Sequence, residues 1–237
     1  MSYSVVQTKA HGSNTGTNVC PITASGAGNF LYCFINCAGS TAPTSVVDNQ
    51  SPTPNTWTLA ASYPSLTEGG VYCYFLPSAS NTGGITSVIV NGGLTGSDGP
   101  QVVVREISGL FGPITAADKT AGQTSSANPA TSGTVSTTSQ ANEFYVGYAG
   151  TITASATPSW TVGSGWSNLS ALFSYNFAGP VLIFSQIEDQ EVTSTGTPAA
   201  TFGNSGTVST NTVIVTFKES GGASTNNHLL SLLDCGT

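Results

Sequence analysis

The densest group of side chains that could do chemistry is an acidic run, Glu188-Asp189-Gln190-Glu191. Because side chains alternate along a strand, Glu188 would lie on one face, and Asp189 and Glu191 on the other. In some sandwich-fold glycosidases an acid-rich strand supplies a nucleophile and a general acid about 5–5.5 Å apart, and Glu143 or Glu106 could complete such a pair. The competing interpretation is a strand end whose solvated carboxylates deter edge pairing. We favour this second interpretation, and we predict that the protein is not an enzyme and uses no cofactor.

Hydrolase chemistry based on serine or cysteine has less support. The sequence contains no G-x-S-x-G elbow. The two histidines, His11 and His228, lie near opposite ends of the chain, where a buried triad would be hard to organise.

Two ligand sites can be drawn from side-chain types. Oxygen ligands in turns suit calcium, although Asx turns at strand ends explain the same residues; the weak candidates are Asp48, Asn49 and Asp98. Exposed aromatic rings could form a sugar-stacking platform, although such rings more often fill a sandwich core; the candidates are Trp57, Trp160, Trp166, Tyr63 and Tyr175.

The five cysteines are Cys20, Cys33, Cys37, Cys73 and Cys235. Cys33 and Cys37 would lie about 13 Å apart along a strand, too far to bridge each other. Either could meet Cys73 on a paired strand, or all three could be reduced and buried. The odd total leaves a partner for another chain in an oxidising medium. We predict an intersubunit disulfide at Cys235, with Cys20 as a possible partner.

Charged residues are scarce. Only 15 of 237 residues are charged, 11 acidic and 4 basic, about 6% where a soluble domain has roughly 25%. Four dispersed basic residues cannot form the cluster that nucleic acid requires, and no apolar run is long enough to span a membrane. The start, MSYSVVQTKAHG, lacks the features of a secretory signal. A surface of hydroxyls and amides suits dense assembly, and release in a virus particle needs no signal.

The elements that must position these residues are strands. Between Gly28 and Gly109, short runs rich in Val, Ile, Phe and Tyr are each ended by Gly, Pro, Asn or Ser. None has helical spacing. Residues 31–37 and 71–76 are apolar on both faces, so we expect both strands to be central and covered on both sides.

The second half of the chain repeats these signals. The stretch AGNFLYCFINCAG (27–39) parallels ANEFYVGYAG (141–150), and four later stretches find counterparts in the same order. The repeat could also be the convergent similarity that any sequence of alternating strands and turns shows. Two halves that each expose an apolar sheet face would bury it against each other. We therefore predict an all-β fold, a two-sheet antiparallel sandwich of jelly-roll type spanning residues 25–219.

Both ends lie outside this predicted domain. Residues 1–24 are expected to form an N-terminal arm, and residues 220–237 a tail in which SGGASTNN is a spacer. The tail ends in an apolar segment that could tuck against its own sandwich or act as an assembly hook on a neighbouring subunit. Its apolar residues are Leu229, Leu230, Leu232 and Leu233.

A series of short motifs runs through residues 25–219: Gly28-Asn29, Val46-Val47-Asp48 with Asn55-Thr56-Trp57, Val104 to Leu110, Ala141-Asn142-Glu143, Gly165-Trp166 and Val215 to Lys218. In this order they resemble β-sandwich modules of phage virion proteins and bacterial surface proteins. The resemblance implies a structural or adhesive module. The SPTP insertion after Asp48 and the two ends of the chain depart from the pattern.

These observations predict a structural, self-assembling protein, a phage virion component such as a capsid decoration, neck or tail-fibre protein. Its partners would be copies of itself and other structural proteins of the particle, with no nucleic acid and no membrane. The alternatives are a subunit of a bacterial extracellular filament at the cell surface, a module that binds a surface glycan, and a sandwich-fold glycosidase.

Overall fold

The first half of the chain forms two antiparallel sheets in the computed structural model, which describes residues 3–13, 16–39, 41–92, 100–153, 157–178, 181–204 and 208–220. The five-stranded sheet has the order β1-β8-β3-β6-β5, and the three-stranded sheet the order β2-β7-β4. A 3-10 turn, η1 (Ser78–Ser80), follows β6. The strands are β1 (Ser4–Gly12), β2 (Thr17–Pro21), β3 (Phe30–Cys37), β4 (Ser45–Asp48), β5 (Thr58–Tyr63), β6 (Gly70–Leu76), β7 (Ser87–Asn91) and β8 (Gln101–Ser108).

The second half also forms two antiparallel sheets. Their orders are β13-β14-β11-β16-β9 and β10-β15-β12. The strands are β9 (Ile114–Ser125), β10 (Ala130–Thr131), β11 (Asn142–Thr153), β12 (Trp160–Thr161), β13 (Phe173–Ala178), β14 (Val181–Thr193), β15 (Thr201–Asn204) and β16 (Thr210–Glu219).

The two halves have the same topology. Adding eight to each strand number of the first half gives the strand orders of the second half. Four of the five parallels predicted from sequence match equivalent strands, β3 with β11 and β8 with β16 among them, so the repeat is present in the fold. The predicted counterpart of β5, residues 165–173, overlaps β13 only at Phe173. The expected jelly-roll order is not confirmed, because each five-stranded sheet takes all its strands from one half.

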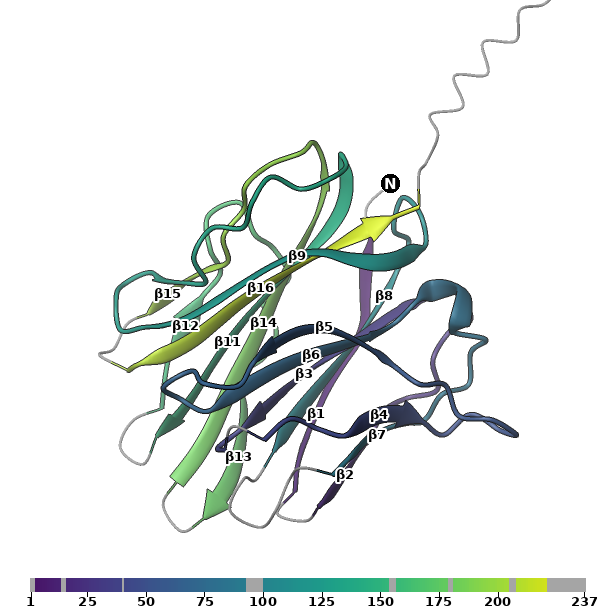
Figure 1. Cartoon of the computed structure of the whole chain (residues 1–237), viewed down its shortest axis with the longest axis horizontal. Coiled ribbons are helices and arrows are strands. Elements are labelled where there is room, and N and C mark those ends of the chain that lie inside the picture. The colour runs from purple at the N-terminus through teal and green to yellow at the C-terminus, as the bar shows by residue number, and fades with distance from the viewer. Residues whose placement is uncertain are drawn as a thin grey trace, which may run out of the picture.

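Three cores separate the layers, and the two large sheets lie between the two small ones (Figure 1). The inner core joins the large sheets; in it the rings of Phe30 and Phe217 lie 5.0 Å apart. The first outer core, with Leu31 and Cys33, lies under β2-β7-β4, and the second, with Trp166, lies under β10-β15-β12. Every residue of β3 and β6 is buried, as predicted, because alternate side chains enter two different cores.

The expected N-terminal arm is wrong for the described residues. β1 pairs with β8 from Ser4 to Gly12, and β2 pairs with β7 from Thr17 to Pro21. Both strands expose alternate residues, so their sequences look too polar for a sheet. The assembly hook Leu229, Leu230, Leu232 and Leu233 lies outside the described residues. In the part of the chain that the structure describes, no helix could cross a membrane.

Candidate functional site

The acidic run on β14 does not converge on one site. Glu188 points into the second outer core, where it accepts the backbone N–H groups of Gly163 (2.8 Å) and Thr201 (3.3 Å). It is fully buried, and burial raises its pKa to about 8. Both hydrogen bonds hold the small sheet of β12 and β15 against β14. Glu188 therefore has a structural role.

Asp189 points the other way, into the inner core. Its Oδ2 lies 2.8 Å from Nη1 of Arg105 on β8, and both side chains are almost completely buried. The Tyr3 hydroxyl (2.7 Å) and the Asn168 side-chain amide (3.1 Å) both donate to Oδ1. Burial raises the pKa of Asp189, and the Arg105 charge opposes that rise. This ion pair connects the two halves of the molecule.

Of the two carboxylates proposed as catalytic partners, Glu106 anchors a loop. Glu106 accepts from Gln7 Nε2 (2.5 Å), the Gly26 N–H (2.7 Å) and Asn29 Nδ2 (2.6 Å). These contacts hold the segment before β3 onto β8 and β1. Glu143 is fully buried in the other half, and burial, with the charge of nearby Asp118, raises its pKa to about 7.

The last acid of the run, Glu191, meets a carboxylate that sequence reasoning missed. Glu219, at the end of β16, interacts with Glu191, and burial together with that neighbouring charge raises the pKa of Glu219 to about 7. Glu191 accepts the N–H of Phe111 (2.7 Å), and Glu219 accepts the N–H of Gly112 (3.0 Å). The two residues are 28 positions apart in sequence, and only the order β14-β11-β16 brings them together. The pair fixes the connection from β8 to β9.

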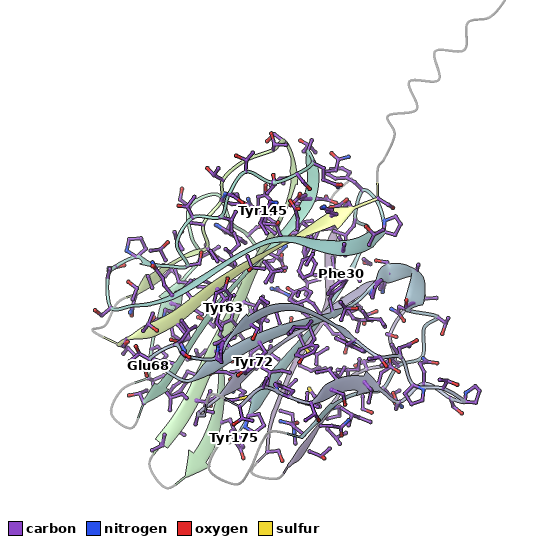
Figure 2. All side chains as sticks on the ribbon, in the orientation of Figure 1. Phe30, Tyr63, Glu68, Tyr72, Tyr145 and Tyr175 are labelled. Carbon is purple, nitrogen blue, oxygen red and sulfur yellow. The ribbon has the colours of Figure 1, made fainter. Side chains whose placement is uncertain are left out.

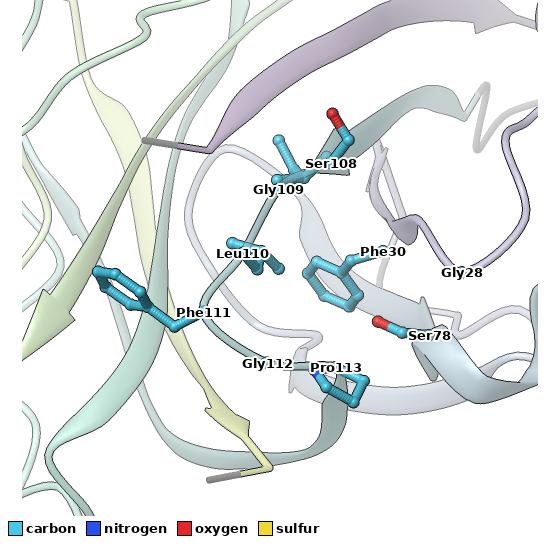
Figure 3. Close-up of a pocket in the computed structure, with 10 residues that line it drawn as sticks. Gly28, Phe30, Ser78, Ser108, Gly109, Leu110, Phe111, Gly112 and Pro113 are labelled. Atoms are coloured by element: carbon cyan, nitrogen blue, oxygen red, sulfur yellow. The ribbon is translucent and has the colours of Figure 1, made fainter. Parts of the chain in front are cut away.

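That connection forms one wall of a pocket of about 270 Å³. Figure 3 shows Phe30, Leu110 and Pro113 around the hollow, and the Phe111 ring pointing away from it. We call it the junction pocket, because it lies where the first half passes into the second. It is lined by Gly28, Phe30, Ser78, Ile107, Ser108, Gly109, Leu110, Phe111, Gly112 and Pro113.

The junction pocket also adjoins the start of the C-terminal tail. The N–H of Ser220 donates to the carbonyl of Pro113 (2.8 Å). A Cβ on Gly112 would lie 2.2 Å from the Ser220 carbonyl oxygen, so only glycine permits this close approach. The chain therefore leaves the described part of the molecule at the rim of the pocket.

The surface that lines the junction pocket is more polar than apolar, although few of its side chains are polar. Its side chains are apolar apart from the hydroxyls of Ser78 and Ser108, and none of the lining residues is titratable. The Ser78 hydroxyl already accepts the N–H of Ile114 (3.1 Å). Gly28 has a φ of +77°, and a side chain built on it would enter open space.

Cys20, Cys33 and Cys73 are free and buried, and Cys37 is buried as well. Cys33 and Cys37 point into the first outer core, and Cys73 into the inner core, so the sheet separates them and the proposed bridge is wrong. Cys20 is fully buried in the first outer core, and burial raises its pKa to about 12. A buried, protonated thiol cannot meet another subunit. Cys235 lies outside the described residues.

The proposed calcium ligands are used within the fold. Asp48 accepts from the N–H groups of Gln50 (3.1 Å) and Asn55 (3.0 Å), and from Asn55 Nδ2 (2.9 Å). Asn49 Oδ1 accepts two backbone N–H groups near β7. These contacts match the Asx-turn interpretation. Asp98 lies outside the described residues, and no group of three possible metal ligands occurs in the remainder.

The proposed sugar platform is wrong. The exposed fractions of Trp57, Trp160 and Trp166 are 3%, 4% and 9%, so their rings belong to the outer cores. Tyr63 lies against β9 (Figure 2), where its hydroxyl contacts Thr120 at 2.9 Å. A Cβ on Gly12 would overlap the ring of Tyr175, so that ring covers β1.

The histidines offer no catalytic arrangement in the described residues. His11 contacts Asn18 (2.8 Å), and His228 lies outside the described part. Of the candidate features described above, the junction pocket is the one that is not already occupied by contacts within the fold. The chain matches no family model, no curated protein and no solved structure.

Proposed function

We propose that this protein is a structural, self-assembling subunit of a phage virion, built as a β-sandwich and joined to its neighbours through the C-terminal tail. The observation that carries the proposal is the position of Ser220, the last described residue before the tail. The chain passes from Ser220, at the rim of the junction pocket, into a sequence that includes four leucines within Leu229–Leu233. Four clustered leucines are unfavourable in water unless another surface covers them.

The scarcity of charge supports the same proposal. With 15 charged residues in 237, two copies can come into contact while desolvating few ions. The carboxylates that could have served catalysis are instead tied into the fold, as Glu106 and Glu188 illustrate. The motifs resemble modules of phage virion proteins and of bacterial surface proteins alike, so a subunit of a bacterial filament remains the alternative.

The N-terminal strands β1 and β2 are paired within the chain's own sheets, so the proposal relies on the tail. Because Cys20 is buried, the proposed covalent link now depends on Cys235 alone. The tail is therefore the element to remove in a test.

Sedimentation velocity of the full chain and of a chain ending at Ser220 tests the proposal. We expect the full chain to form oligomers whose population rises with concentration, and the shortened chain to stay monomeric with an unchanged melting temperature. A full chain that stays monomeric throughout would contradict self-assembly and favour a single binding module. Electron microscopy of the native particle then distinguishes a virion from a filament.

A further inference from the structure

We infer that Lys218 and Asp118 react to form an intramolecular isopeptide bond, with Glu143 as the group that transfers the protons. The three side chains come from neighbouring strands of the second large sheet, whose order β11-β16-β9 places Lys218 between the other two. The product is a covalent crosslink between β16 and the edge strand β9. This inference is independent of the proposed assembly.

The register of the strands brings the three groups together. Asp118 and Lys119 on β9 form a bulge and lie opposite a single residue of β16, Thr216. Such a bulge re-aims side chains and is common beside active sites. On the other side of β16, Lys218 pairs directly with Glu143 of β11, so their side chains lie on the same face of the sheet.

The amine and the carboxyl group are already in contact. Nζ of Lys218 lies 3.3 Å from Oδ1 of Asp118, and the Asp118 side chain is only 3% exposed. Nζ of Lys119 lies 3.6 Å from the same oxygen, but it is Lys218 that pairs with Glu143. Well-oriented groups held about 3–3.5 Å apart react as if they were highly concentrated, and a buried carboxyl group meets little water that could reverse the reaction.

Ser139 holds the Asp118 carboxyl group in place. Its backbone N–H donates to Oδ2 (2.6 Å), and its hydroxyl donates to Oδ1 (2.8 Å). Although burial opposes ionisation, these hydrogen bonds lower the pKa of Asp118 to about 2, so the carboxyl group starts as an anion. When an amine adds to Cγ, negative charge stays on Oδ2, where the N–H of Ser139 stabilises it. Oδ1 needs protons before it can leave.

Glu143 supplies those protons. It is fully buried, and burial, together with the charge of Asp118, raises its pKa to about 7. A carboxyl group whose pKa is near the working pH both gives and takes protons readily. Its place beside Asp118 and opposite Lys218 lets it serve the amine and the leaving oxygen in turn.

The step balances without a further reactant. The Glu143 proton passes to Oδ1 of Asp118, and Glu143 takes a proton from the Lys218 ammonium, which becomes a neutral amine. The amine nitrogen forms a bond to Cγ. A second proton then moves from that nitrogen to Oδ1 through Glu143, the Cγ–Oδ1 bond breaks, and Oδ1 leaves as water. One ammonium and one carboxylate have become one amide and one water, and Glu143 ends protonated, as it began.

Mass spectrometry of the intact, denatured full chain, after storage near neutral pH, tests the inference. We expect a mass lower by one water than that calculated from the sequence, and a crosslinked peptide that contains residues 118 and 218 after proteolysis. Lys218→Arg should keep the full mass, because the guanidinium keeps the positive charge but stays protonated and cannot attack. Its matched control is Lys119→Arg, at the other lysine that contacts Asp118, which should still lose the water.

Glu143→Gln tests the proton transfer. The amide fills the same space but cannot carry the proton, and a positioned acid–base group contributes about 10²–10⁴ to a rate. After equal storage we expect the crosslinked fraction to be at least about 10-fold below that of the wild type, with an unchanged circular dichroism spectrum.

The contrary outcomes are distinct. A folded wild type with the full sequence mass would show that Lys218 and Asp118 form an ion pair only, and would overturn the inference while the proposed assembly stands. Loss of water that survives in Lys218→Arg would exclude Lys218 as the amine. A folded Glu143→Gln that crosslinks as fully as the wild type would exclude Glu143 as the acid–base group; if this variant does not fold, Lys218→Arg against Lys119→Arg still decides whether the bond forms.

Discussion

The inner core has two sides that the repeat relates to each other: a position of the first half on one side corresponds to a position of the second half on the other. The residue types on the two sides nevertheless differ. Arg105 pairs with Tyr32 across β3 and β8, as Val215 pairs with Val146 across β11 and β16. Asp189 pairs with that same Val146. Phe75 pairs with Tyr32 in the same way, so the Arg105–Asp189 ion pair corresponds to Val215 and Phe75.

The apolar side is an aromatic cluster, in which the rings of Phe75 and Phe217 lie 5.2 Å apart. The polar side adds contacts that reach beyond the two sheets. Arg105 also donates to the carbonyl of Asn168 (2.5 Å), a residue held at φ +54°. Tyr3 reaches Asp189 from the segment before β1.

The difference bears on how a duplicated chain pairs its halves correctly. Two first halves from different chains could place their large sheets together, since both carry an apolar inner face. In that arrangement Arg105 of each chain would face Phe75, the equivalent of Asp189, and two buried charges would lack a partner. A buried ion pair adds little net stability, but leaving one member unpaired is costly. The pair therefore favours the first half packing on the second.

Removal of Asp189 should give the largest effect. Asp189→Ala leaves Arg105 buried without its carboxylate, so we expect the free energy of unfolding to fall by about 4 kcal/mol, measured by urea denaturation. The double variant Arg105→Met, Asp189→Leu should recover to within about 1 kcal/mol of the wild type, because two apolar groups replace both charges. A loss below about 1 kcal/mol for the single variant would show that the ion pair does not hold the halves together.

Truncation on the apolar side should cost somewhat less. Phe75→Ala opens a cavity beside Phe217 and should lower the free energy of unfolding by about 3 kcal/mol. Phe75→Leu, which keeps most of the volume, is the control and should lose less than half as much. If the loss of stability for Phe75→Ala instead grows at low salt, as an electrostatic loss would, the two sides of the inner core do not differ in chemistry.

The last prediction concerns the pH dependence of stability. It separates the buried acids of the second half from the ion pair. Burial raises the pKa of Glu219 and Glu143 to about 7 and that of Glu188 to about 8. The folded state then binds these protons more tightly than the unfolded chain, whose glutamates titrate near about 4.3. Stability should therefore fall as pH rises from about 4.3 to about 8.

Denaturation midpoints at pH 5 and pH 8 measure this slope. Glu219→Gln should flatten it, because the amide carries no charge at either pH and can still accept the N–H of Gly112. Glu68→Gln, a change at a position outside the three buried sites, is the control. A wild type that is more stable at pH 8 than at pH 5 would contradict the raised pKa values.

Some of the fold was predictable because its cause is local. Residues 30–37 and 71–76 are apolar on both faces, and a strand with that pattern must be covered twice; both are buried throughout. The order of apolar runs and turn residues also revealed the repeat. The polar stretch 111–140 carries no such pattern, because β9 is an edge strand whose residues are mostly half-buried.

The sequence alone determined the all-β class, the central strands and the repeat of the two halves, because alternation and turn chemistry act between near neighbours. Only the tertiary structure decided that Glu188 and Asp189 enter different cores, that Glu191 meets Glu219, and that β1 and β2 complete the sheets. It also decided that the tail starts beside the junction pocket. These contacts depend on the order of strands in a sheet. The residue types along one strand do not determine which distant strand lies next to it.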